Sequence, residues 1–234
     1  MSEQAPSQRE VVGELVVNVV IPSVVLLWLS GDDALGPLWA LVLALLPPLG
    51  WGAASMVRSG RVSGLAVIAF GSVLLTGGVG LFELEPSWIA VKEALVPSLF
   101  GVATIATAPT RYAVVPTLLA RMFDLAAVEE AVEAKGVQES WQVALRRSTV
   151  YVGLLFLLSA GLSYGLARYL VRSPAGTEAF NSELGWMTML SIPGVMVPMT
   201  FGMAFVLSRL LTTLETLTEA DYEAYLLGHD EAST

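Results

Sequence analysis

The chain has 234 residues, of which 55% are hydrophobic and only 14% are charged, and its formal net charge is -9. Ordinary soluble domains carry about 25% charged residues, so the composition predicts a polytopic membrane protein. The chain lacks cysteine, and its one histidine, His229, lies near the C-terminus, which excludes disulfides, thiolate metal sites and histidine-based triads. The negative charge argues against nucleic acid as a partner. We expect no cofactor, no metal site, no catalytic residues and no enzymatic activity.

Six apolar stretches predict six membrane-spanning helices, because a helix needs roughly 20 residues to cross a bilayer. The predicted fold class is all-α: a bundle of six transmembrane helices with an additional amphipathic cytoplasmic helical segment. A polar N-terminal arm (1–10) precedes the transmembrane domain (11–211), and an acidic cytoplasmic tail (212–234) follows it. The spans are about Val11–Leu29, Pro37–Val57, Val62–Leu81, Trp88–Thr107, Ser148–Tyr169 and Met189–Leu211.

The connection between the fourth and fifth spans (108–147) is long and amphipathic. In it, five acidic side chains balance five basic ones. We interpret it as a helix lying along the cytoplasmic face of the membrane, and a helix that binds a partner protein is the alternative. Its apolar residues recur at helical spacing, at Leu118, Met122, Leu125, Val128 and Val132.

Lysine and arginine are distributed unevenly between the two predicted sides of the membrane. Of the twelve Lys and Arg residues, only Lys92, Arg168 and Arg172 lie on one side. The other nine share a side with both termini and the 108–147 connection. Because cytoplasmic loops carry the excess of Lys and Arg, the pattern predicts that both termini are cytoplasmic.

Prolines fall near the centres of four predicted spans. A proline removes a backbone N–H and crowds the preceding turn, and carbonyls freed near the midplane are used by transporters to build binding sites. The alternative is that proline is simply common in spanning helices. The candidate helix breaks are Pro22, Pro47, Pro48, Pro97, Pro193 and Pro198.

Polar residues inside the spans are candidates for lining a pathway. Ionisable groups in a span are costly and usually face an interior or a cavity, although groups near helix ends can reach the interface instead. We expect Lys92 to point away from its neighbour Glu93, because adjacent helical residues do not face each other. The pathway candidates are Glu14, Asn18, Ser23, Glu93, Ser98 and Thr200.

Gly161 and Gly165 form a G-x-x-x-G pattern in the fifth span. Such small faces let two helices approach closely. We expect these glycines to face another helix of the same chain, with contact to a second copy of the chain as the alternative.

Four stretches resemble a known family: NVVIPSVVLLWLSGDDALGP, LLTGGVGLFELEPSWIAVKEALVP, SAGLSYGLARYLVRSPAGTEAFNSELG and MTMLSIPGVMVP. Together they resemble an uncharacterised family of bacterial six-helix inner-membrane proteins. That family is distantly similar to the intracellular septation protein A family, mainly through the W-x-x-x-K-E start of the fourth span. The resemblance implies a multi-pass protein of the bacterial cytoplasmic (inner) membrane, linked to envelope or division machinery. The family pattern leads us to expect an asparagine at position 163, where this chain has Ser163. A site built from two asparagines, with Asn18 as the other, would therefore lack one of them here.

These features lead to two functional interpretations. The first is a small-solute or ion transporter or channel with a midplane polar pathway, which requires Glu14, Asn18 and Glu93 to face the bundle interior. The second is a non-transporting envelope or division (septation-like) membrane scaffold. The expected partners are the lipid bilayer, and either other envelope membrane proteins or further copies of the chain as a homo-oligomer.

Overall fold

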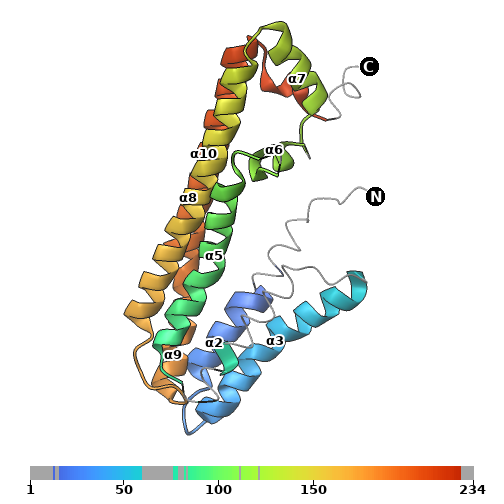
Figure 1. Ribbon diagram of the computed structural model, residues 1–234. Helices are drawn as coiled ribbons and strands as arrows, with labels where there is room; N and C mark the ends of the chain where they lie inside the picture. The colour runs from blue at the N-terminus through green and yellow to red at the C-terminus, as the bar shows by residue number, and fades with distance from the viewer. Residues whose placement is uncertain are drawn as a thin grey trace. The chain divides into compact units, whose positions relative to one another are not determined.

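The described chain consists of helices joined by short connections (Figure 1). The computed structural model describes residues 13, 16–59, 76–78, 82, 84–110, 112–120 and 122–227, without the side chains of residues 18, 48 and 51–59. Within these residues there is no strand, and one isolated antiparallel bridge joins Phe123 to Leu226. The all-α class predicted from the sequence is confirmed for this part of the chain.

Three helices are long and apolar enough to cross a membrane. Twenty helical residues rise about 30 Å, which is the thickness of the hydrocarbon core of a bilayer. The length and composition of these helices are those of a membrane protein, and they correspond to the fourth, fifth and sixth predicted spans. They are α5 (Ser87–Thr107), α8 (Gln138–Leu170) and the continuous helix Glu178–Thr218, which comprises α9 (Glu178–Ser191), the π-helix η2 (Ile192–Met196) and α10 (Val197–Thr218).

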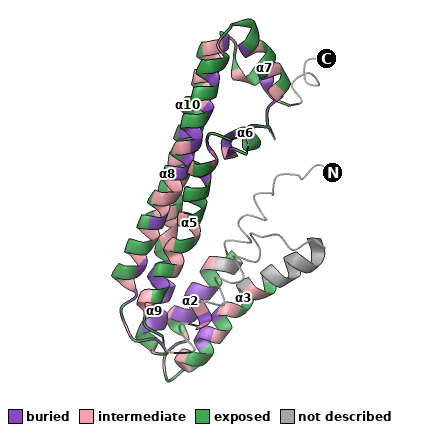
Figure 2. Ribbon diagram, viewed as in Figure 1, coloured by how far each residue is buried: buried purple, intermediate pink, exposed green. Residues whose placement is uncertain are grey.

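Large apolar side chains remain exposed along the long helices, as the green segments of Figure 2 show. Phe201 and Phe205 on α10 are 72% and 66% exposed, and Leu99 on α5 is 61% exposed. A soluble monomer rarely exposes large contiguous apolar patches, whereas a helix in a bilayer presents such a surface to lipid. The burial pattern therefore agrees with a membrane protein.

The first two predicted spans also form helices. The π-helix η1 (Val16–Val20) leads directly into α2 (Ile21–Trp28), and α3 (Gly36–Ser59) follows after a turn. Of the third predicted span, only residues 76–78 are described, and they are helical. The count of six spanning helices therefore stays a prediction.

Two of the predicted spans begin earlier than expected. Helix α8 begins at Gln138 rather than Ser148, because its added turns bury Trp141 and Leu145 in a core. Helix α9 begins at Glu178 rather than at Met189, the predicted start of the sixth span. Its start is stabilised by the side chain of Thr177, which accepts a hydrogen bond from the Phe180 N–H at 3.2 Å and so satisfies a free donor of the first turn.

The predicted amphipathic segment (108–147) is not one helix: it contains the short helices α6 (Val114–Leu119) and α7 (Leu125–Ala134) and the start of α8. The prediction of one helical repeat through it was wrong, because Leu118 and Met122 are exposed whereas Val128 and Val132 are buried. The chain turns between α6 and α7, and Asp124 caps α7 by accepting hydrogen bonds from the N–H groups of residues 126 and 127.

The predicted acidic tail is partly folded. Helix α10 continues to Thr218, and the 3-10 helix η3 (Tyr222–Tyr225) folds back onto the start of α7. The N–H of Asp124 donates to the carbonyl of Tyr225 at 2.8 Å, and that of Leu227 donates to the carbonyl of Met122 at 3.0 Å. Apolar tail residues thus share a core with α6 and α7. We call residues 114–145 and 206–227 together the head.

The chain divides into two compact units, each with its own core. Unit 1 comprises Met1–Val96 and Gly161–Met196, and unit 2 comprises Pro97–Ala160 and Val197–Thr234. The boundaries between the units fall at Pro97 in α5, at Gly161 in α8 and at the end of η2. Proline and π-turns interrupt the regular hydrogen bonding of an α-helix.

Candidate functional site

The described pathway candidates are divided between the two units. Ser23 and Glu93 belong to unit 1, whereas Ser98 and Thr200 belong to unit 2. Glu14 lies outside the described residues, as does the side chain of Asn18, so their predicted inward orientation stays a prediction.

Glu93 lines a small cavity in unit 1. The cavity has a volume of about 120 Å³. Helix α5 contributes Glu93, α8 contributes Ser163, and α9 contributes Thr188 and Ser191. Thr188 and Ser191 share one face of α9, because residues three apart are neighbours on a helix surface. Leu166 and Met187 complete the lining. Four polar side chains from three helices therefore converge on one small space.

The polar groups of this Glu93 cavity favour a positively charged or hydrogen-donating occupant. Thr188 Oγ1 donates to the carbonyl of Leu184 at 2.9 Å, and Ser191 Oγ donates to the carbonyl of Thr188 at 2.6 Å. Because these two hydroxyl protons are already used, their oxygens offer only lone pairs to the cavity. An ionised Glu93 is also an acceptor. The cavity therefore suits a cation better than an anion.

Lys92 forms an ion pair with Glu93, which corrects the expectation that the two side chains point apart. The Lys92 side chain is 10% exposed and that of Glu93 is 32% exposed. The Lys92 ammonium also donates a hydrogen bond to Thr76 Oγ1 at 2.7 Å. The expectation considered only the directions in which adjacent side chains leave the helix, whereas the four-carbon stem of lysine is long enough to bend back.

Ser23 lies at a packed interface between α2 and α9. It is fully buried, and its Oγ has no hydrogen-bond partner among the described residues. A Cβ added at Gly185 would lie 3.1 Å from the carbonyl oxygen of Ser23, so the two helices are in close contact there. Ser98 is half-buried on α5 and Thr200 is exposed on α10.

The sequence reasoning missed a buried amide, Asn181, at the start of α9. Its Nδ2 donates to the carbonyl of Pro37 at 2.6 Å and to Ser30 Oγ at 3.2 Å, while Oδ1 has no partner among the described residues. Asn181 thereby joins α9 to the turn between α2 and α3. Its position outside the predicted spans concealed this role.

The prolines lie in helices that continue past them. Pro22 lies in the first turn of α2, directly after η1, and Pro193 lies inside η2. Pro97 lies inside α5, and Pro198 lies in the first turn of α10. A π-turn changes the local hydrogen-bonding pattern, and such turns are frequent at functional sites. Pro47 and Pro48 lie within α3, which also continues past them.

Gly161 and Gly165 are exposed, and a Cβ added to either would meet no described atom within 4 Å. The structure thus describes no helix against these glycines, and their packing on another helix stays a prediction because most of the third predicted span lies outside the described residues. The close helix contact in unit 2 instead uses Gly101 of α5 and Gly153 of α8. A Cβ on either glycine would lie within 3.0 Å of the other's carbonyl oxygen. A glycine pattern within one helix does not predict this contact, because the contact needs one glycine from each helix.

Three searches bear on the relationships of this chain: no family model, no curated protein and no solved structure matches it.

Proposed function

We propose that this protein is a multi-pass transporter or channel for a small cation or small polar solute, with the Glu93 cavity as one binding site along the pathway. The observation that carries the proposal is a carboxylate in α5, a helix long and apolar enough to cross a membrane, that lines a cavity with three hydroxyl groups from two other helices. Ionisable residues in spanning segments are rare and commonly mark ion and substrate pathways.

The size and chemistry of the cavity favour a small hard cation. One water takes up about 30 Å³ of liquid, so about 120 Å³ admits an ion with a few waters but not a large solute. Carboxylate and hydroxyl oxygens are hard ligands, as alkali and alkaline-earth cations prefer. An entering cation would compete with Lys92 for the Glu93 carboxylate. This competition gives the site a way to release its ion, because the ion pair with Lys92 re-forms.

We further propose that the protein resides in a bacterial inner membrane with both termini and the 108–147 connection in the cytoplasm. The uneven distribution of Lys and Arg supports this orientation. Glu93 would then lie in the outer half of the bilayer, about 9 Å along α5 from its first residue at 1.5 Å per residue.

Cation uptake into proteoliposomes tests the proposal. The parent protein, Glu93→Gln and Glu85→Gln are compared with sodium, rubidium and a proton gradient as probes. Glu85 is the control, because it is exposed, precedes α5 and does not line the Glu93 cavity. We expect saturable uptake of at least one ion by the parent and by Glu85→Gln, and its loss in Glu93→Gln with unchanged helicity. Uptake that is equal in Glu93→Gln, or no uptake above protein-free liposomes, would overturn the proposal.

The head favours a second candidate function, an envelope or division scaffold. Residues 122–124 and 225–227 are joined by backbone hydrogen bonds, so the C-terminal part of α10 is tied into a folded structure beyond the apolar spans. Such a structure offers a surface to a membrane-protein partner or to a second copy of the chain. Absence of uptake, together with a stoichiometric complex that requires the head, would favour the scaffold over the transporter.

A further inference from the structure

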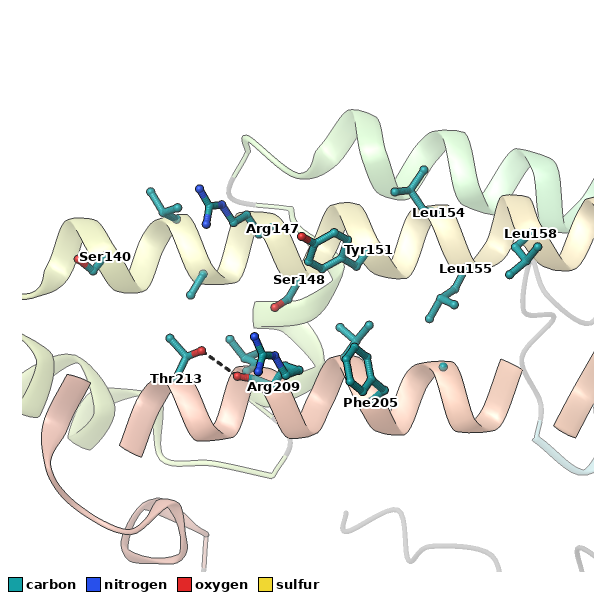
Figure 3. A pocket seen from close by; sticks show the side chains of 15 residues that line it. Ser140, Arg147, Ser148, Tyr151, Leu154, Leu155, Leu158, Phe205, Arg209 and Thr213 are labelled. Atoms are coloured by element: carbon teal, nitrogen blue, oxygen red, sulfur yellow. Dashed lines mark hydrogen bonds between the residues drawn. The ribbon is translucent and has the colours of Figure 1, made fainter. Parts of the chain in front are cut away.

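A second feature lies wholly within unit 2 and shares no residue with the Glu93 cavity. Helices α8 and α10 line an open groove of about 630 Å³, which Figure 3 shows from close by. One end of the groove holds Arg147 and Arg209 with the hydroxyls of Ser148 and Tyr151. The other end is apolar and includes Leu158 and Phe205. The groove is therefore amphipathic along its length.

The two arginines lie where the apolar parts of both helices end. Residues 148–167 of α8 and residues 184–208 of the α9–α10 helix contain no charged side chain. Arg147 immediately precedes the first of these stretches, and Arg209 immediately follows the second. In a bilayer both guanidinium groups therefore fall near the same membrane–water interface, with the apolar end of the groove towards the hydrocarbon core.

The positive charge at this end of the groove is uncompensated. Within the part of the chain that the structure describes, the ion pairs are Lys92–Glu93 and Lys135–Glu219, so neither Arg147 nor Arg209 has an acidic partner. No carboxylate lines the groove. In Figure 3 the Ser148 hydroxyl and the Arg209 guanidinium enter the gap from opposite helices. Arginine is well suited to phosphate because its planar fork donates two parallel hydrogen bonds.

We infer that this groove binds an anionic phospholipid, with the phosphate at Arg147 and Arg209 and an acyl chain along Leu154, Leu158 and Phe205. The charge of the arginines complements the phosphate, and their level matches the depth of lipid headgroups. The apolar end of the groove matches the chain that the headgroup brings with it. The proposal does not depend on transport, since an annular or regulatory lipid would bind a scaffold equally well.

Lipid binding to the full-length protein can be measured by native mass spectrometry from a neutral detergent, with phosphatidylglycerol and phosphatidylcholine as probes. We expect tighter binding of phosphatidylglycerol. Each arginine should contribute about fivefold, as a basic residue near an anionic surface is worth about 1 kcal/mol. The double variant Arg147→Gln/Arg209→Gln should therefore weaken binding roughly 25-fold. Arg146→Gln is the matched control, because Arg146 is exposed and adjacent but does not line the groove.

Two further measurements distinguish the binding of a whole phospholipid from the binding of phosphate alone. Leu158→Gln keeps both arginines and should weaken phosphatidylglycerol binding through the acyl chain. Inorganic phosphate in excess should form no adduct and should not displace the lipid. The inference is overturned if phosphatidylcholine binds as tightly as phosphatidylglycerol, or if Arg146→Gln matches the double variant. It is also overturned if Leu158→Gln has no effect, or if phosphate alone occupies the site.

Discussion

Replacing Gly153 with alanine tests the packing of α8 on α5 within unit 2. The new Cβ would lie 2.5 Å from Ile105 Cγ1, 3.0 Å from the Gly101 carbonyl oxygen and 3.2 Å from the Ile105 backbone nitrogen. The Ile105 side chain can change rotamer, but the two backbone atoms belong to α5 and cannot move alone. The helices must therefore separate by a few tenths of an ångström. Overpacking of this kind costs about 1–3 kcal/mol.

Gly161→Ala is the matched control, because it lies on the same helix and its added Cβ meets open space. Both substitutions gain up to about 1 kcal/mol from the higher helix propensity of alanine, so their difference isolates the steric cost. For a chain of this size, 1 kcal/mol shifts Tm by about 2–4 °C. We expect Gly153→Ala to melt about 2–12 °C below Gly161→Ala when tryptophan fluorescence is followed in detergent. Equal melting temperatures would refute the close contact.

Three further predictions concern the head and the topology. Glu219 has a φ of 56°, in the left-handed region that favours glycine, so Glu219→Gly should melt higher than Glu219→Ala, which keeps the strain. The hydrogen bond from Lys135 lowers the pKa of Glu219 below its usual 4.5, so this pair stabilises above that pH and loses its effect as pH falls through the lowered pKa. Because the pair is exposed, the gap in Tm between the parent and Lys135→Ala should be small, shrink with salt and vanish in acid. The chain has no native cysteine, so single cysteines introduced at exposed Ser140 and exposed Ala179 can report the topology. The first should react with an impermeant maleimide only from the cytoplasmic side and the second only from the outside. The reverse labelling would show that the protein has the opposite orientation in the membrane.

The sequence predicts the apolar spans well and their polar extensions poorly. The predicted Trp88–Thr107 and the observed α5 differ by one residue, because the apolar run alone decides where this helix lies. The first ten residues of α8 contain charged and polar side chains, so no hydropathy signal marks them. Trp141 buried in the head core stabilises these turns, and that core exists only after the distant α10 and η3 have packed. Tertiary contacts, rather than local propensity, extend the helix.

Of the residues that line the candidate site, only Glu93 was predictable from the sequence, because a carboxylate is costly to place in a membrane span. Glu93 stands out in the sequence as a carboxylate inside an apolar run, whereas Thr188 and Ser191 are ordinary hydroxyls near a conspicuous proline. Their convergence depends on how α5, α8 and α9 pack, which no spacing within one helix encodes. The ion pair of Glu93 with Lys92 depends on a lysine rotamer. That rotamer is set by the partners within reach, including Thr76, rather than by helical periodicity.

In the proposed function, the Glu93 cavity takes up a cation from water. A single cysteine at Ser163 tests it most directly, because Ser163 lines the cavity and the native chain has no cysteine to interfere. We expect this cysteine to react with the water-soluble cationic reagent 2-aminoethyl methanethiosulfonate in proteoliposomes, and sodium or potassium, relative to choline, to slow the reaction. Tyr164→Cys is the control: Tyr164 is adjacent and 45% exposed on the apolar helix surface but does not line the cavity, so it should stay unreactive in the bilayer. A cysteine at Ser163 that is no more reactive than one at Tyr164, or that reacts at the same rate in every salt, would contradict the claim.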